Sequence, residues 1–377
     1  CIRDRLVRVS IQHPAVADVL AQQGRGPEAR DTGCLMGAQG TDPRLHLTPS
    51  PHLKAPVSTP RIMWTVTASL VPVLAVATYY FGPSALLVVG SATLGAVSTE
   101  RVFGPSRSLG DGSGALTGLL LGITLPPGLP IWMAFLGGAF GVGFGKLVFG
   151  GLGQNVFNPA LLGRAFLQAA FPAALTTWPA ATESWWGLGD STLALPFTSP
   201  APDAVTGATP LGLMKFESTS TATWDLMVGQ TGGSIGETAG LVILLCGAYL
   251  AAWNYLNWRA PVGIFATVAL ASGLLFMIDS ARYPSPTFAL FSGGLMLGAV
   301  YMATDPVTSP VTNRGVWIFS VGVGILVVTI RSWGGLPEGV MYAILLMNAL
   351  TPFINRATQP RPFGAEPTRT RPAGGPG

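Results

Sequence analysis

Residues 62–99 read IMWTVTASLVPVLAVATYYFGPSALLVVGSATLGAVST and contain no aspartate, glutamate, lysine or arginine. Gly82-Pro83 interrupts this stretch near its middle, because glycine and proline break regular structure, and leaves apolar segments at about 62–81 and 84–99. A helix needs roughly 20 apolar residues to cross the hydrocarbon core of a bilayer. The stretch therefore predicts two membrane-spanning helices.

The composition of the whole chain agrees with this prediction. Of its 377 residues, 49% are hydrophobic and only 10% are charged, whereas a soluble globular protein carries about 25% charged residues. The 49 glycines and 32 prolines follow no G-X-Y period, and small residues of this kind let helices pack closely in membranes. These counts exclude a large water-soluble domain, a wholly disordered chain and collagen.

Further apolar segments follow along the chain, and several of them are short or broken by glycine and proline. Together they predict an all-α polytopic membrane protein with about ten transmembrane helices. The expected spans are 62–81, 84–99, 113–125, 131–149, 159–172, 238–257, 260–278, 287–303, 316–331 and 338–355.

Loop charges predict the orientation, because cytoplasmic loops carry an excess of lysine and arginine. With both termini in the cytoplasm, eight cations fall on the inside: Arg61, Arg101, Arg107, Lys146, Arg259, Arg314, Arg356 and Arg361. Lys215, Arg282 and Arg331 fall outside, as does the mainly acidic loop 173–236. This distribution favours an orientation with both termini in the cytoplasm and the long loop on the outer side of the membrane.

Two halves of the chain resemble each other. Residues 150–157 align without gaps with residues 334–341, and Ser113 pairs with Ser292 after a small shift in register. About five helices make one unit, and an odd number of crossings gives the two copies opposite topology. We therefore expect two inverted five-helix repeats with broken helices, an architecture similar to that of urea transporters.

This pattern divides the chain into five parts. Residues 1–50 are expected to form a disordered cytoplasmic extension and 357–377 a disordered cytoplasmic tail, because both are polar and lack helical periodicity. The membrane repeats occupy 51–172 and 237–356, on either side of the extracytoplasmic loop 173–236.

Residue counts exclude several kinds of site. The three cysteines form no CxxC pair, so an iron–sulfur cluster or a zinc ribbon within this chain is not expected. All three histidines precede the first apolar span, which excludes histidine-ligated haem or zinc and a histidine-based catalytic dyad in the apolar body. The net charge of +4 comes from cations scattered at span ends, so no nucleic-acid surface is predicted.

One motif in the long loop stands out: Asp203, then Thr206-Gly207-Ala208-Thr209 and Pro210. Gly207 permits a turn, and Pro210 disfavours helical geometry at Thr209. Thr209 would then present its hydroxyl from an extended, accessible segment, as a modifying enzyme requires. Taken by itself, a threonine beside glycine and proline is more often only a turn residue.

Several motifs in the right order resemble one family. The D-x-x-T-G-A-T pattern is similar to the flavinylation motif, and roughly residues 50–365 resemble the membrane protein RnfD of the Rnf electron-transport complex and its counterpart in the sodium-pumping NADH:quinone reductase. The motifs are Gly150-Gly151-Leu152-Gly153-Gln154-Asn155, Phe157-Asn158-Pro159-Ala160, Thr304-Asp305-Pro306-Val307-Thr308, Thr312-Asn313-Arg314-Gly315, Ser332-Trp333-Gly334-Gly335 and Pro337-Glu338-Gly339.

The resemblance implies a flavin-carrying component of an ion-translocating ferredoxin:NAD oxidoreductase. A flavin transferase would attach FMN covalently to Thr209, with Asp203, Thr206, Gly207 and Ala208 shaping the acceptor loop. A second, non-covalent flavin, riboflavin, is also implied. Other membrane and peripheral Rnf subunits would be the partners, and electron transfer would be coupled to Na⁺ or H⁺ transport.

Polar residues near the helix breaks are candidates for binding the second flavin or a cation. Asn155, Asn158, Asp305 and Asn313 carry suitable amide and carboxylate groups, although Asn158-Pro159 and Asp305-Pro306 also suit helix caps.

Two cations lie within or beside apolar segments. Arg164 either balances a phosphate or polar flavin group or extends to an interface. Lys146 is expected to reach the membrane surface, because it lies near a span end. The alternative function is a flavin-free channel or solute transporter built from the same repeats.

Overall fold

The computed structural model describes residues 58–105, 108–178, 192–196, 208–217, 219–229, 231–237, 240–280 and 282–360. Within these ranges every regular element is a helix, which confirms the predicted all-α class. Residues 1–50, much of the loop 173–236 and residues 361–377 of the expected disordered tail 357–377 lie outside the described residues. Helix continues to Thr358, past residue 357, where the tail is expected to begin.

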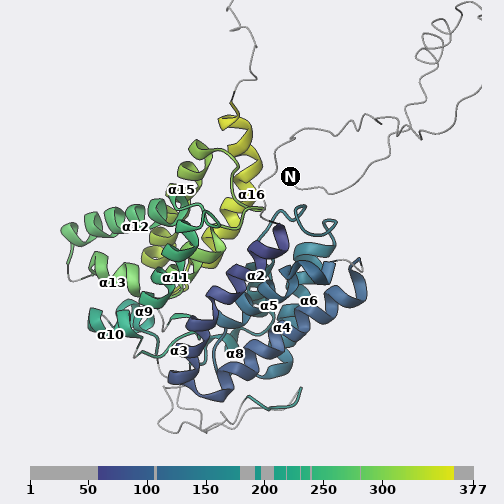
Figure 1. Cartoon of the computed structure of the whole chain (residues 1–377). Coiled ribbons are helices and arrows are strands. Elements are labelled where there is room, and N and C mark those ends of the chain that lie inside the picture. The colour runs from purple at the N-terminus through teal and green to yellow at the C-terminus, as the bar shows by residue number, and fades with distance from the viewer. Residues whose placement is uncertain are drawn as a thin grey trace, which may run out of the picture. The chain divides into compact units, whose positions relative to one another are not determined.

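The first half of the described chain contains seven α-helices and two short irregular helices (Figure 1). They are α2 (Thr59–Ser69), α3 (Val71–Phe81), α4 (Pro83–Phe103), η1 (Ser108–Asp111), α5 (Ser113–Ile123), α6 (Ile131–Val142), η2 (Gly143–Leu147), α7 (Pro159–Ala170) and α8 (Pro172–Thr176).

The second half begins with short helices and ends with long ones. They are α9 (Pro210–Gly212), η3 (Leu213–Glu217), α10 (Thr223–Val228), α11 (Gly240–Ala252), α12 (Arg259–Ile278), α13 (Pro286–Phe291), α14 (Leu295–Leu297), η5 (Gly298–Met302), α15 (Asn313–Trp333) and α16 (Val340–Thr358). In Figure 1 the purple and blue helices of the first half meet the green and yellow helices of the second along α2 and α11.

Four described helices are long and apolar enough to cross a membrane: Thr59–Phe81, Pro83–Phe103, Arg259–Ile278 and Asn313–Trp333. Helix also lies in each of the other expected segments, but those helices are shorter or broken. Breaks at Gly82, which has φ 71°, and before Pro172 fall where glycine and proline predict them. The count of ten crossings remains a prediction.

Close packing of α4 against α6 depends on glycine. A Cβ at Gly95 would lie 2.1 Å from the carbonyl oxygen of Phe135, and a Cβ at Gly138 would lie 2.0 Å from that of Ala92. Larger side chains at these positions would therefore separate the two helices. A continuous apolar core extends from these helices into the second half of the chain.

A buried ion pair fixes the other end of α4. Lys146 donates hydrogen bonds to Glu100 and to Ser113, and the two charged side chains are only 1% and 2% exposed. The prediction that Lys146 reaches the membrane surface is therefore wrong. The reason is that α4 continues to Phe103, past the expected end at residue 99, and buries Glu100 beside Lys146.

Candidate functional site

Thr209 lies at the start of α9, in the described part of the motif loop. Its backbone is extended, with φ −66° and ψ 154°, as Pro210 predicts. Its Oγ1 accepts a hydrogen bond from the backbone N–H of Gly212 at 3.1 Å, so Thr209 caps the helix. Ala208 is exposed, while Asp203, Thr206 and Gly207 lie outside the described residues.

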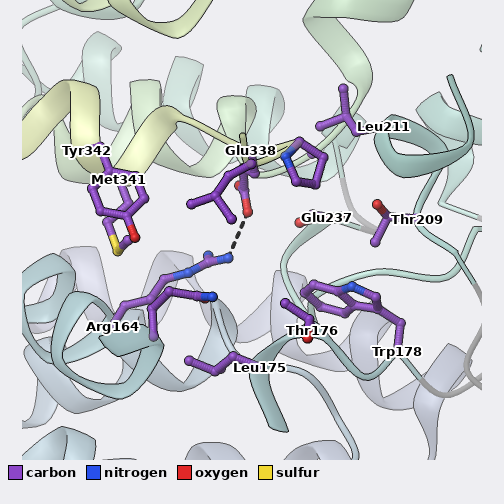
Figure 2. A pocket seen from close by; sticks show the side chains of 14 residues that line it. Arg164, Leu175, Thr176, Trp178, Thr209, Leu211, Glu237, Glu338, Met341 and Tyr342 are labelled. Atoms are coloured by element: carbon purple, nitrogen blue, oxygen red, sulfur yellow. Dashed lines mark hydrogen bonds and ion pairs between the residues drawn. The ribbon is translucent and has the colours of Figure 1, made fainter. Parts of the chain in front are cut away.

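The expected accessibility of Thr209 is not observed. The residue is only 9% exposed, because Pro210 and Leu211 draw the segment into the packed body. Its side chain instead lines a cavity of about 70 Å³. Across this cavity lie Arg164, Glu237, Glu338 and Trp178 (Figure 2).

Arg164 and Glu338 form an ion pair across this cavity. Arg164 Nη2 donates to Glu338 Oε2 at 2.7 Å, and the other carboxylate oxygen of Glu338 accepts from the backbone N–H of Gly294 at 2.9 Å (Figure 2). Arg164 comes from α7, and Glu338 lies just before α16. The pair therefore joins the two halves of the chain, and Arg164, which is 9% exposed, does not extend to an interface.

Glu237 is the second carboxylate of this cavity and is partly buried. Burial raises the pKa of Glu237 to about 7, and the charge of Glu338 adds to this shift. Arg164 and hydrogen bonds from Ser234 oppose it. Glu237 and Glu338 are not among the residues that the sequence predicts for the site. The sequence feature that could have identified Glu237 is its position as an isolated acid directly before an apolar run, with no cation nearby.

A larger cavity of about 390 Å³ lies beside the first, and Leu211 and Pro337 line both. Three cations line the larger one: Lys215, Arg282 and Arg331. Arg331 donates to the carbonyl oxygens of Ala289 and Ser292 at 2.6 and 2.9 Å. Lys215 donates to those of Gly334 and Leu336. The cavity therefore suits a ligand that carries negative charge.

The remaining predicted residues lie elsewhere. Asn155, Asn158 and Asp305 line a third cavity of about 100 Å³, together with Lys146 and others. Asn313 is exposed in the first turn of α15 and does not line it. The structure thus brings three of these four candidates together.

The predicted capping roles differ between the two candidates. Asn158 Oδ1 accepts from the backbone N–H groups of Ala160 and Leu161, which confirms it as the cap of α7, while its Nδ2 donates to the carbonyl oxygen of Met302 at 3.3 Å. Asp305 caps no helix. Its carboxylate accepts from Val307 N–H and the Thr308 hydroxyl within a turn, and Thr312 caps α15 instead.

Comparisons with known proteins identify the family of this chain. The family model described as the NQR2, RnfD, RnfE family matches residues 46–364. The D subunit of the ion-translocating oxidoreductase complex of Stutzerimonas stutzeri is 43% identical over 328 residues, which cover 81% of this chain and 92% of that protein.

Two relatives have more specific names. The D subunit of the proton-translocating ferredoxin:NAD(+) oxidoreductase complex of Clostridium ljungdahlii is 40% identical, over 84% of this chain and 96% of that protein. The D subunit of the Na(+)-translocating ferredoxin:NAD(+) oxidoreductase complex of Acetobacterium woodii is 40% identical, over 85% and 95%. With its long apolar helices, the chain is a multi-pass membrane protein that belongs to the NQR2, RnfD, RnfE family.

Proposed function

We propose that this chain is the D subunit of an ion-translocating ferredoxin:NAD oxidoreductase complex and carries FMN on Thr209. The observation that carries the proposal is the position of Thr209. It closes the Thr-Gly-Ala-Thr motif, in a chain of this family, and its side chain lines a cavity that Arg164 also lines. The names of the relatives supply the reaction and the complex.

The size and charge of the cavities support a flavin attached at this point. The cavity at Thr209, about 70 Å³, is smaller than the roughly 300–1,000 Å³ of typical ligand sites, but the adjoining cavity of about 390 Å³ falls within that range. Thr209 would hold the phosphate, and Lys215, Arg282 and Arg331 surround space for the ring system. A flavin at this site supplies reversible one- and two-electron transfer.

The protein's contribution is binding and electrostatics. Cations lining a cavity of low dielectric stabilise negative charge more strongly than water-exposed cations do. They favour the reduced form of an attached flavin. Negative charge added to a flavin held there would attract Na⁺ or H⁺, and this attraction would link electron flow to ion transport.

The second flavin implied by the family does not fit the third cavity. Asn155, Asn158 and Asp305 have suitable hydrogen-bonding groups, but about 100 Å³ holds only a few waters or a small cation.

The proposal includes the predicted topology and partners. The support for inverted repeats is the sequence alignment of the two halves, in which Ser113 pairs with Ser292. The flavin loop would face the periplasm, with both termini in the cytoplasm. Because Thr209 is mostly buried, the flavin transferase would act while the loop is outside the cavity.

The test is the mass of the peptide that contains Thr209, taken from the complex expressed with its flavin transferase. We expect added FMN, and we expect the flavin fluorescence of the denatured chain to disappear in Thr209→Ala. Thr176→Ala is the matched control, because Thr176 lines the same cavity outside the motif. An unmodified peptide, or fluorescence that persists in Thr209→Ala, contradicts the proposal and favours a flavin-free channel or transporter.

A further inference from the structure

We propose that Glu237 takes up a proton when the flavin on Thr209 is reduced, so that the cavity between Thr209 and the Arg164–Glu338 pair is a redox-linked proton site. The inference rests on the proposed function and adds a residue to it. The electron comes from a one-electron carrier in a neighbouring protein of the complex. The proton moves from water in the cavity to a carboxylate oxygen of Glu237, and reoxidation returns it.

The first support is position. Glu237 and Thr209 line the same cavity, and Figure 2 shows Glu237 between Thr209 and the Arg164–Glu338 pair. About 70 Å³ accommodates a few water molecules, so a proton has a path to the carboxylate. Charge added at Thr209 or in the adjoining cavity therefore acts on Glu237 over a short distance.

The second support is that the cations near Glu237 already have other partners. Arg164 is committed to Glu338, which also binds the backbone N–H of Gly294. Arg331 lies within electrostatic range of both carboxylates, but it donates its hydrogen bonds to the carbonyl oxygens of Ala289 and Ser292.

Within the described residues, Ser234 is the group that stabilises the charge of Glu237 by hydrogen bonding. Of the charged groups facing this cavity in the described chain, Glu237 is thus the one most easily neutralised. Burial and Glu338 already raise its pKa to about 7.

The expected coupling is large enough to measure. One added charge on the order of 10 Å away, at an effective dielectric constant of about 20, shifts a protonation equilibrium roughly tenfold. The added charge is negative, so the affinity of Glu237 for a proton rises on reduction. Below about pH 7 Glu237 is protonated in both redox states. Between about pH 7 and about pH 8, reduction draws in a proton.

The test is the midpoint potential of the flavin on Thr209, measured on both sides of pH 7 in the assembled complex. Between about pH 7 and about pH 8 we expect the wild-type potential to show an extra pH dependence whose total is one tenfold change, or about 59 mV for a one-electron step. Glu237→Gln should lose this extra slope, and Glu237→Asp should keep one. Glu217→Gln, an exposed carboxylate of η3, should behave as wild type.

A second readout needs no flavin. The infrared band of a protonated carboxyl group should titrate near neutral pH in the Thr209→Ala chain and disappear when Glu237→Gln is added. If Glu237→Gln shifts the midpoint potential by the same amount at every pH and leaves the pH slope unchanged, Glu237 does not take up the proton. It then affects the flavin only through its charge. FMN absent from the Thr209 peptide would instead overturn the proposed function itself.

Discussion

The buried pair of Lys146 and Glu100 provides a direct test of the packing. Lys146→Met keeps the length of the side chain but removes its charge, and it leaves Glu100 buried, at 2% exposed, without its cation. Breaking such a pair from one side costs about 3–5 kcal/mol, because the remaining charge is kept from water and has lost the cation beside it. The variant should therefore lose a large part of a typical folding free energy of about 5–15 kcal/mol.

Glu100 has no room to escape the loss of its partner. A Cβ on Gly114 would lie within 1.8 Å of Glu100 Oε2, so the neighbouring helix already contacts the carboxylate. Removing both charges, in Lys146→Met with Glu100→Gln, should restore much of the lost folding free energy. The reason is that a neutral amide costs less to bury than a carboxylate whose cation has been removed. We expect the double variant to differ from the sum of the single variants by about 1–3 kcal/mol.

The assay is reversible unfolding of the purified protein in detergent, followed by circular dichroism. Arg101→Gln is the control, because Arg101 is exposed on the same helix, and it should change stability by no more than about 0.5 kcal/mol. A Lys146→Met protein as stable as wild type, or strict additivity in the double variant, would show that this pair is not buried as described.

Three further predictions concern packing and charge. Gly138→Ala should destabilise the protein by about 1–3 kcal/mol in the same unfolding assay, because its Cβ would lie 2.0 Å from a carbonyl oxygen of α4. Gly90→Ala is the control: a Cβ there would have nothing within 4 Å, so this variant should be neutral or stabilising. Thermal stability should fall as pH rises from about 4.5 to about 7, since the folded state holds the Glu237 proton more tightly than the unfolded chain, and a Glu237→Gln melting curve should lack this slope. Arg164→Gln leaves Glu338 unpaired near a second carboxylate, so melting temperatures should show a larger loss at pH 8 than at pH 5.

Segment positions can be predicted because they depend on local composition. Runs without charge, interrupted by glycine and proline, indicate where helices begin and end, and the break at Gly82 and the cap at Asn158 follow from single residues. The extended backbone of Thr209 likewise follows from the proline after it. Each of these features needs only a few neighbouring residues to form.

Pairing between segments cannot be predicted in the same way. Lys146 and Glu100 are 46 residues apart, and Arg164 and Glu338 are 174 apart. Hydropathy reports whether a segment avoids water and does not report which segment it meets. A charged residue near a span end therefore looks the same whether it reaches the surface or finds a buried partner. For this reason the sequence alone does not identify Glu237.

Helix α7 shows why these pairings matter for function. Asn158 caps its first turn and lines the cavity of about 100 Å³, while Arg164 lines the cavity at Thr209. Six residues of helix separate them by only about 9 Å along the axis. Both residues also bind the second half of the chain, through Met302 and Glu338. A change of charge at Thr209 that alters the Arg164–Glu338 pair therefore acts on α7. The other end of this helix borders the third cavity, the one of about 100 Å³.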